Sequence, residues 1–310
     1  MTEFVIIGFG AAGEAAAKRL KELSPDSKVA VISDEKDHFY YRLRLCEYIS
    51  GKIDAKALFV DDAIYLNKGI DIVRNRAVKV QKDNVITEDG KVHRFDALLI
   101  STGGVPNRMR IPGSQLSGVF TLRFFHEAKE IKKNLGSCSR AVVVGGGILG
   151  MDIADALHSA GKDVTMLVRE KTLGFPLLTP ENAKKREIAM RNNGIDIHFE
   201  EELTQINGKT QVESVTTSKG IKIDADMVIV AIGIRPNVDF LSGGIINMHR
   251  GILINDKFQT NIPSIFAAGD VIELDQESTE SIYQKGTWGQ AYNQGRAAAE
   301  NMLSYVGVKL

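Results

Sequence analysis

Apolar residues in this chain occur in short runs that alternate with longer helical patterns. The run at Glu3–Ile7 is of strand type, and it passes directly into an alanine-rich helical pattern over Ala11–Leu23. This pattern ends at Ser24-Pro25, because proline disfavours the helical conformation at the residue before it. A second apolar strand follows at 29–32. The beginning of the chain therefore predicts a strand–helix–strand unit.

The same pattern returns in the middle of the chain. An apolar strand at Arg140–Val144 precedes a helical pattern that runs to about Ser159, and a second strand follows at 164–168. Strands that alternate with helices predict an α/β fold with parallel sheets. Turn and capping residues bound the remaining elements: buried strands at 95–101, 226–232 and 265–267, an antiparallel ribbon around 83–90, a helix opened by Thr179-Pro180, and a helix over 290–305 opened by Thr287 and Gln290 as a capping box.

A glycine pattern, G-x-G-x-x-G, connects the first strand to the first helix. Gly8 permits a tight turn, Gly10 has no Cβ to keep a pyrophosphate away, and Gly13 lets helix and strand pack closely. The phosphate charge would then lie on free N–H groups at the helix N-terminus. After the second strand, about 20 residues past the glycines, Asp34 or Glu35 is placed to bind an adenosine ribose, unless it is a solvated turn acid.

A second G-x-G-x-x-G pattern, with Gly145, Gly147 and Gly150, joins the strand and helix in the middle of the chain. Each of the two units also contains a later buried strand that is followed by glycine and then by proline, at 98–106 and at 226–236. One glycine pattern alone is a weak signal, whereas two complete units of the same kind are specific. The sequence therefore predicts two bound dinucleotides.

Composition narrows the possible partners and the compartment. Since the formal net charge is zero, no long-range field would recruit nucleic acid or an anionic membrane. The two cysteines, Cys46 and Cys138, offer neither a disulfide framework nor a zinc-binding spacing, so we expect no metal site. No apolar run approaches the length of a membrane span, and a strand that begins at Glu3 leaves no room for a signal peptide. We therefore expect a cytoplasmic protein.

Three stretches allow two interpretations from their residues alone. The aromatic and basic stretch at 37–48, which contains Arg42, could wrap a ligand or form a core-packing helix with surface arginines. Thr102 and Gly103 follow a buried strand and could face a ligand or belong to a linker. Asp270 ends a strand and could bind a ligand or cap a helix.

Together these motifs resemble the FAD-dependent pyridine nucleotide–disulfide oxidoreductase superfamily, in the order in which that family carries them. The resemblance implies two Rossmann-like three-layer domains. An NAD(P)H-binding domain at 111–236 would be inserted into an FAD-binding domain formed by 1–110 and 237–310. The stretch at 40–47 is most similar to NADH:rubredoxin reductases and to the flavin region of assimilatory nitrite reductases.

The resemblance also implies which residues bind each cofactor. Asp270 would bond the ribityl chain of FAD, and the helix after Thr287 would direct its positive end at the flavin. The residues implied for FAD are Gly8, Gly10, Ala12, Gly13, Asp34, Glu35, Arg42, Thr102, Gly103, Gly269, Asp270 and Trp288. Those implied for NADH or NADPH are Gly145, Gly147, Ile148, Leu149, Gly150, Asp152, Arg169, Glu170 and Gly233.

The choice between NADH and NADPH depends on the residues after the second strand of the middle unit. Val168 stands where the family usually has a ribose-binding acid, and Arg169 and Glu170 follow it. Arg169 could clamp the 2′-phosphate of NADPH, or Glu170 could accept hydrogen bonds from the ribose of NADH. Of these two open alternatives, we prefer NADH.

The chain departs from the family at its cysteines and at its end. The disulfide-reducing members have C-x-x-C or C-x-x-x-x-C, and neither occurs here. In members with one redox cysteine, that position corresponds to Leu43. Cys46 is therefore expected to be a buried, inert neighbour of the cofactor. Relatives usually continue into a C-terminal interface domain. We expect that domain to be absent here, because the sequence stops at Leu310, either naturally or by truncation.

These inferences predict an NAD(P)H-dependent FAD flavoprotein oxidoreductase. Electrons would pass from NAD(P)H through FAD to a small redox carrier, such as rubredoxin or a ferredoxin-like iron–sulfur protein. Two alternatives remain open. One is a single-cysteine disulfide, persulfide or peroxide reductase that uses Cys46. The other is a non-turnover flavoprotein sensor that binds NAD(P)H.

Overall fold

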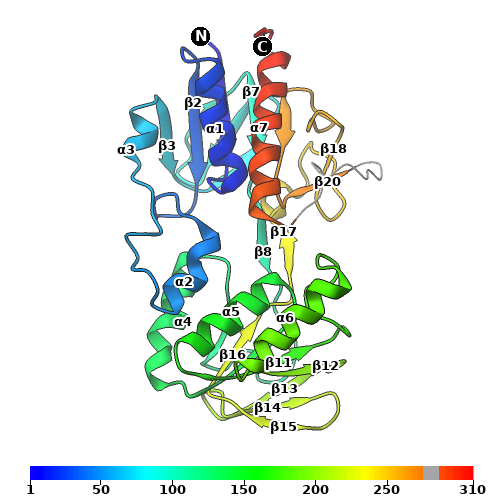
Figure 1. Ribbon diagram of the computed structural model, residues 1–310. Helices are drawn as coiled ribbons and strands as arrows, with labels where there is room; N and C mark the ends of the chain where they lie inside the picture. Colours follow the sequence, from blue (N-terminus) through cyan, green and yellow to red (C-terminus); the bar gives the residue numbers. More distant parts are fainter. Residues whose placement is uncertain (275–285, 310) are drawn as a thin grey trace. The chain divides into compact units, whose positions relative to one another are not determined.

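The structure is a computed structural model that describes residues 1–274 and 286–309 (Figure 1). Its contacts divide the chain into two compact units. Unit 1 comprises Met1–Tyr41, Phe59–Val105 and Arg235–Leu310, and unit 2 comprises Arg42–Leu58 and Pro106–Ile234. The family resemblance implies that residues 42–58 belong to the first segment of the FAD-binding domain, whereas in the structure they pack with unit 2.

Unit 1 is built on a five-stranded parallel sheet in the order β19-β7-β1-β2-β3. Parallel strands that are buried on both faces have continuous apolar sequences. β1 has such a sequence, with Phe4, Val5 and Ile6 each at most 2% exposed. The elements of the sheet are β1 (Glu3–Ile7), β2 (Lys28–Ser33), β3 (Ile70–Arg74), β7 (Ala97–Ile100) and β19 (Ile265–Ala267).

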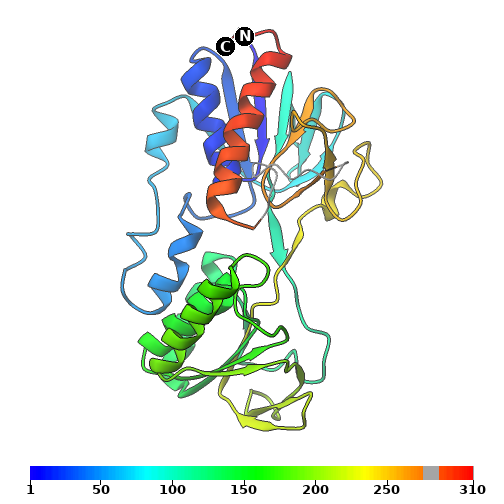
Figure 2. The ribbon, with the colours of Figure 1, turned by 45° about the vertical axis from the view of Figure 1, so that its right-hand side comes forward.

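Two helices of unit 1, α1 (Ala11–Leu23) and α7 (Trp288–Tyr305), lie side by side along their length (Figures 1 and 2). They approach so closely that a Cβ on Gly295 would come within 2.1 Å of the carbonyl oxygen of Ala12. The antiparallel sheet β4-β5-β6 adds Val80 and Val85 to the same core. Other elements of unit 1 include α3 (Ala63–Leu66), β4 (Ala77–Val80), β5 (Asn84–Thr87), β6 (Val92–Arg94), β18 (Ile252–Ile254) and β20 (Ile272–Leu274). The short strands β8 (Gly104–Pro106) and β17 (Ile234–Pro236) pair with each other.

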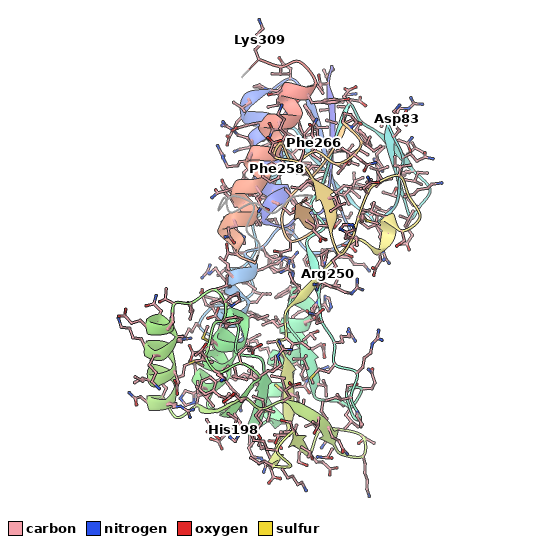
Figure 3. The ribbon with its side chains drawn as sticks, turned by 90° about the vertical axis from the view of Figure 1, so that its right-hand side faces the viewer. Asp83, His198, Arg250, Phe258, Phe266 and Lys309 are labelled. Atoms are coloured by element: carbon pink, nitrogen blue, oxygen red, sulfur yellow. The ribbon has the colours of Figure 1, made fainter. Side chains whose placement is uncertain are left out.

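A strained residue supports the strand that leads to the Gly269-Asp270 motif. Phe258 has a φ of 61°, a left-handed conformation that is uncommon for a bulky residue. Its ring is only 2% exposed, and its carbonyl accepts a hydrogen bond from the Ala267 N–H at 2.9 Å. Phe266, on β19, is buried in the same core (Figure 3). Burial of two aromatic rings thus stabilises a backbone conformation that would otherwise be costly.

Unit 2 repeats the architecture of unit 1. Its parallel sheet has the order β12-β11-β10-β16-β9, and a three-stranded antiparallel sheet, β13-β14-β15, packs Val215 into a core with Val142 and Val144 of β10. Its strands are β9 (Val119–Thr121), β10 (Arg140–Val144), β11 (Asp163–Val168), β12 (Asp196–Phe199), β13 (Leu203–Asn207), β14 (Ser214–Thr217), β15 (Lys222–Asp224) and β16 (Met227–Val230). Its helices include α2 (Leu45–Ile49), α4 (Phe125–Asn134), α5 (Ile148–Ser159) and α6 (Pro180–Asn192).

The helix α2 accounts for the assignment of residues 42–58 to unit 2. It packs against α4 and α5. Lys132 of α4 donates a hydrogen bond to the carbonyl of Tyr48 at 2.6 Å, and its ammonium group lies 4.0 Å from the centre of the Tyr48 ring. Tyr48 in turn contacts the ring of Phe125, with centroids 5.3 Å apart. These tertiary contacts have no periodic signal in the sequence.

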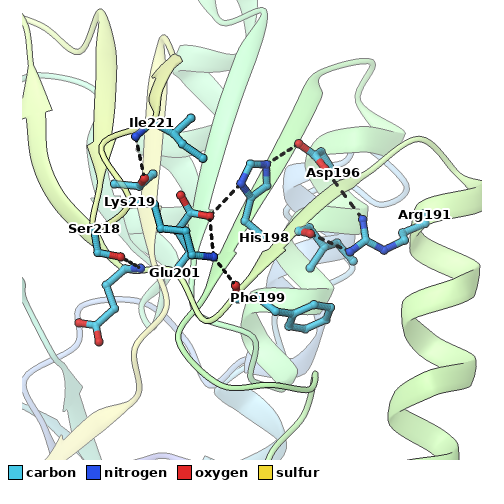
Figure 4. A network of polar contacts seen from close by, with 11 residues as sticks. Arg191, Asp196, His198, Phe199, Glu201, Ser218, Lys219 and Ile221 are labelled. Atoms are coloured by element: carbon cyan, nitrogen blue, oxygen red, sulfur yellow. Dashed lines mark hydrogen bonds and ion pairs between the residues drawn. The ribbon is translucent and has the colours of Figure 1, made fainter.

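A polar network joins the edge strand β12 to the antiparallel sheet (Figure 4). The two ring nitrogens of His198 lie 2.7 Å from a carboxylate oxygen of Asp196 and 3.1 Å from one of Glu201. Glu201 is only 2% exposed, and Lys219 lies 3.5 Å from the same carboxylate. Burial opposes ionisation of Glu201, but hydrogen bonds and the positive charges around it outweigh this effect and lower its pKa. The network therefore holds a buried charge with several partners.

The α/β fold class expected from the sequence is confirmed, since both units contain parallel sheets with strand–helix–strand connections. The expected helix at 290–305 begins two residues earlier, at Trp288, because Thr287 is its N-cap and accepts a hydrogen bond from the Gln290 N–H. The Gln290 side chain accepts from the Thr287 hydroxyl at 2.7 Å. Among the described residues, no helix is both long and apolar enough to span a membrane.

Candidate dinucleotide-binding sites

In the first glycine loop, between β1 and α1, neighbouring backbone atoms leave no room for a side chain at two of the three glycines. Gly8 has a φ of +101°, and a Cβ there would lie 2.4 Å from the Ser101 carbonyl oxygen. A Cβ on Gly13 would lie 2.0 Å from the carbonyl oxygen of Gly8. In contrast, nothing lies within 4 Å of a Cβ built on Gly10. Gly10 therefore faces open space, and a ligand could approach the loop backbone closely at this residue.

The second glycine loop, between β10 and α5, has the same geometry. Gly145 has a φ of +114°, and a Cβ there would lie 2.3 Å from the Ala231 carbonyl oxygen. A Cβ on Gly150 would lie 2.1 Å from the carbonyl oxygen of Gly145, whereas a Cβ on Gly147 would meet nothing within 4 Å. Two loops in separate units thus share two sterically required glycines and one glycine that faces open space.

The helices after these loops begin without side-chain caps. Gly10 is the N-cap of α1 and Gly147 the N-cap of α5, and neither helix has a side-chain hydrogen bond at its cap. By comparison, Thr179 and Thr287 cap α6 and α7 with their hydroxyl groups. Free N–H groups at a helix N-terminus bind anions such as a pyrophosphate. Both loops therefore fit the pyrophosphate of a dinucleotide.

The structure distinguishes the two acids after β2. Glu35 accepts a hydrogen bond from the Tyr40 hydroxyl at 2.7 Å, so its carboxylate is already engaged. Asp34 is exposed at the carboxyl end of the sheet, beside the first glycine loop in strand order. Both acids therefore stay candidates for the ribose: Asp34 is the more exposed of the two, and Tyr40 orients Glu35.

Thr102 and Gly103 follow β7, which is adjacent to β1 in the sheet. The Ser101 hydroxyl donates to the carbonyls of Ile7 and Gly8, at 3.1 and 3.0 Å. The Thr102 hydroxyl donates to the Asn237 carbonyl at 2.8 Å. Gly103 has a φ of 66°. These side-chain bonds show that this strand exit supports the glycine loop and the returning segment of unit 1.

Gly269 and Asp270 follow β19, which lies at the sheet edge next to β7. The Gly269 N–H donates to the side chain of Gln294 at 2.9 Å, and Gln294 is fully buried. Sequence reasoning misses Gln294, although a glutamine among the small residues of a packed helix face is a signal for such a buried bond. Asp270 accepts a hydrogen bond from the Gly286 N–H at 3.3 Å, just before α7.

Trp288 and Ala12 occupy two different parts of unit 1. Trp288 begins α7 and stacks on Tyr292, with ring centroids 5.2 Å apart, and it also contacts Tyr41 at 6.0 Å. Ala12 is 4% exposed and packs against Gly295 of α7. The aromatic group at the start of α7 therefore lies in the same unit as the first glycine loop, and Ala12 serves helix packing.

Arg42 lies in unit 2, unlike the other residues implied for FAD, and Cys46 lies in unit 2 as well. Arg42 donates to the Arg123 carbonyl at 3.2 Å and lies over the Phe124 ring at 5.3 Å. Burial, followed by the negative charges of Asp152, Asp155 and Glu47, raises the pKa of the Cys46 thiol to about 12. Because the thiolate is the reactive form, this environment makes Cys46 a poor nucleophile at neutral pH.

The residues implied for NAD(P)H all lie in unit 2. Ile148 and Leu149 open α5 and are 39% and 37% exposed, and Gly233 follows β16 with a φ of 87°. Asp152 lies one turn into α5, and desolvation, with the charge of Asp155, raises its pKa. Glu170 accepts two hydrogen bonds from the Arg169 guanidinium, at 2.9 and 3.2 Å. The nucleotide candidates therefore all belong to the unit that carries the second glycine loop.

Comparison with known proteins gives the family. The model of the pyridine nucleotide-disulphide oxidoreductase family matches residues 2–297. The chain belongs to this family. It is therefore an oxidoreductase that uses a pyridine nucleotide and FAD, as the sequence predicts.

Three relatives show how far the likeness extends. The chain is 30% identical to the nitrite reductase [NAD(P)H] of Bacillus subtilis over 87% of its length, but it spans only 34% of that protein. It is 29% identical to the rubredoxin-NAD(+) reductase of Ectopseudomonas oleovorans, covering 86% of this chain and 71% of the relative. The crystal structure of NADH:rubredoxin oxidoreductase from Clostridium acetobutylicum superposes with a TM-score of 0.78 at 25% identity, covering all of this chain and 76% of the other.

Proposed function

We propose that this family member takes electrons from NADH and passes them through FAD to a small iron–sulfur carrier of the rubredoxin or ferredoxin type. The observation that supports the proposal most directly is the duplicated glycine loop, with an uncapped helix after each copy. Two relatives are named for rubredoxin as their partner. Because the chain spans only part of the length of its relatives, we propose the chemical class of the electron acceptor and not a particular protein.

Unit 1 would hold FAD through its backbone and two carboxylates. The N–H groups at the start of α1 would bind the pyrophosphate, with Gly10 leaving room for close approach. Asp34 would accept hydrogen bonds from the adenosine ribose, and Asp270 from the ribityl hydroxyls. The positive end of α7, capped by Thr287, would stabilise negative charge on the flavin.

When bound, FAD supplies a centre that accepts two electrons as hydride and releases them singly. The protein's own contribution is to bind and orient both cofactors, and such positioning can lower a barrier by about 7–11 kcal/mol. No described side chain is required as an acid or base in this scheme. Unit 2 would hold the donor at the N-terminus of α5.

NADH is the proposed donor because of the residues that follow β11. Val168 is fully buried and packs beside Gly146 of the loop, so this position offers no carboxylate to a ribose. Arg169 is paired with Glu170. The carboxylate reduces the positive charge available to a 2′-phosphate and leaves one oxygen to accept from a ribose hydroxyl.

The thiol-reductase alternative depends on Cys46 as a redox group. The raised pKa of Cys46 argues against it, since nucleophilic attack on a disulfide needs the thiolate. We expect Cys46→Ser to leave the NADH-dependent reduction of a one-electron carrier within about twofold of wild type, because a thiol that stays protonated contributes nothing to electron transfer. Loss of turnover in this variant would favour the thiol mechanism.

The proposal is tested by offering alternative acceptors to the FAD-loaded protein. With NADH as donor, we expect fast reduction of rubredoxin or a ferredoxin, and slow reduction of coenzyme A disulfide and of oxygen. Rapid disulfide reduction, lost in Cys46→Ser, would overturn the proposed acceptor. Slow transfer to every acceptor would indicate that the protein does not turn over at a useful rate.

A further inference from the structure

The two glycine loops differ at the residue between their first two glycines. The second loop has Gly146 there, and a Cβ on it would lie 2.6 Å from Val168. The first loop has Phe9, whose side chain is only 7% exposed. Because the Phe9 ring is buried, side chains of unit 1 must pack around it.

Two aromatic rings enclose Phe9. The Tyr65 ring stands edge-on to it, with centroids 5.0 Å apart and an interplanar angle of 70°, and the Phe39 ring lies 5.5 Å away. Tyr65 and Phe39 also contact each other at 6.2 Å. Aromatic pairs in tilted or edge-to-face geometry are favourable beyond the area that they bury. The loop backbone at Phe9 is therefore held through its side chain.

Tyr65 is itself fixed by a charged pair on α1. It is fully buried, and its hydroxyl donates to a carboxylate oxygen of Glu14 at 3.2 Å. Burial, followed by the charge of Glu14, raises the pKa of Tyr65, so the phenol keeps the proton that it donates. Glu14 is 2% exposed and forms an ion pair with Lys18, whose ammonium group lies 5.4 Å from the Tyr65 ring centre. We call Phe9, Phe39, Tyr65, Glu14 and Lys18 the Phe9 cluster.

The charge of Glu14 also bears on phosphate binding. Glu14 directly follows Gly13 and lies in the first turn of α1. A carboxylate there favours the helix but would repel a pyrophosphate at the same N-terminus. Lys18, one turn later, offsets that charge through the ion pair. The cluster thus combines mechanical support of the loop with charge compensation beneath it.

We infer that Tyr65 is a positioning residue for FAD, which holds the first glycine loop through Phe9, and that Lys18 preserves FAD affinity by neutralising Glu14. The inference rests on the proposed binding of FAD by unit 1. It goes beyond that proposal because α3, which carries Tyr65, contains none of the residues implied for either cofactor.

The first test measures the Kd of FAD for the apoprotein by flavin fluorescence. We expect Tyr65→Leu to raise this Kd about tenfold, which is the loss of about 1.4 kcal/mol, and Tyr65→Phe to raise it less because the ring remains. Binding of NADH by unit 2 should stay at the wild-type level. Tyr305→Leu is the control for loss of a tyrosine ring contact outside the cluster. Tyr305 is 45% exposed and makes an edge contact with Phe266 at the C-terminal end of α7, so its replacement should leave FAD binding unchanged.

The second test separates charge compensation from packing. Lys18→Met should weaken FAD binding several-fold, and adding Glu14→Gln to it should restore affinity, because the uncompensated charge is then removed. Failure of the double variant to recover would overturn the role of Lys18. An unchanged FAD Kd in Tyr65→Leu, or an equal loss of NADH binding, would overturn the role of Tyr65. If the wild-type protein binds no FAD, the proposed function itself fails, which is a separate result.

Discussion

Backbone contacts at single glycines determine the shape of both loops. Gly8 and Gly13 lie so close to neighbouring carbonyl groups that no side chain fits, whereas Gly10 faces open space. The same division holds for Gly145 and Gly150 against Gly147. Two glycines of each loop therefore serve folding, and the third is free to serve the ligand.

This division gives a prediction for two alanine variants. Gly13→Ala should lower the free energy of unfolding by about 1–3 kcal/mol, the usual cost of overpacking, because its Cβ would meet the Gly8 carbonyl. Gly10→Ala should leave thermal stability near wild type but weaken FAD binding. Thermal melts of the apoprotein, together with FAD titrations, measure both effects. Equal destabilisation by the two variants would contradict this division of roles.

The donor preference is tested at Glu170. Glu170→Gln removes the charge that engages Arg169 and would leave the guanidinium available to a 2′-phosphate. We expect kcat/KM for NADPH to rise about fivefold to tenfold, corresponding to about 1–1.4 kcal/mol, and kcat/KM for NADH to fall. Arg169→Ala in the same background should cancel the gain. An unchanged ratio of the two donors would show that Glu170 does not select between them.

The glycines could be predicted from the sequence because their requirement is local, being set by the turn from strand to helix. The partners of Gln294 and Tyr65 could not be predicted, since they lie far away in the sequence, at Gly269 and at Phe9. The bond from the Tyr40 hydroxyl that orients Glu35 likewise could not be predicted from the sequence.

At the level of elements, α1 and α7 pack closely together at Gly295. Gly295→Leu should push the helices apart, because even a Cβ would meet the Ala12 carbonyl at 2.1 Å. We expect the free energy of unfolding to fall by about 3 kcal/mol or more, measured by urea denaturation. Gly289→Ala, also in α7 but with nothing within 4 Å, is the control and should be neutral or slightly stabilising.

The start of β10 gives a prediction about pH. Asp226 accepts hydrogen bonds from the Ser139 and Arg140 N–H groups, both at 2.9 Å. Burial opposes its ionisation, but these bonds and the Arg140 side chain outweigh burial and lower its pKa. A lowered folded-state pKa contributes stability above the unfolded value of about 3.9, and this stability is lost as pH falls through the folded value.

Asp226→Asn should therefore be less stable than wild type at neutral pH by about 1 kcal/mol, and its stability should fall less steeply below about pH 4. Urea denaturation at a series of pH values measures both curves. Parallel curves for wild type and variant would show that Asp226 does not contribute to acid unfolding.

Among the helices, the long ones were predictable and the short ones were not. α1 has the bounds expected from its periodicity, and the threonine caps of α6 and α7 lie where the sequence indicates. The four-residue helix α3 and the five-residue helix α2 carry no periodic signal. They are held by tertiary contacts, such as the Lys132–Tyr48 bond, which outweigh local propensity.

For the whole molecule, the two units have corresponding strand orders, with the loop-bearing strand at the centre of each sheet and a three-stranded antiparallel sheet inserted before the next parallel strand. Ligands of open parallel sheets bind at the carboxyl ends of the strands, beside the central loop. The sequence reveals this duplication through its repeated motifs. It could not assign residues 42–58 to unit 2, because that depends on packing against α4 and α5.

The central claim is that one chain binds FAD in unit 1 and a nicotinamide donor in unit 2 and joins them in one redox reaction. Anaerobic stopped-flow mixing of the FAD-loaded protein with NADH tests it most directly. We expect the oxidised-flavin absorbance to bleach rapidly and completely, faster than with NADPH, and equally fast in Cys46→Ser. A protein that retains no flavin, or whose bound flavin neither nucleotide reduces, would contradict the account.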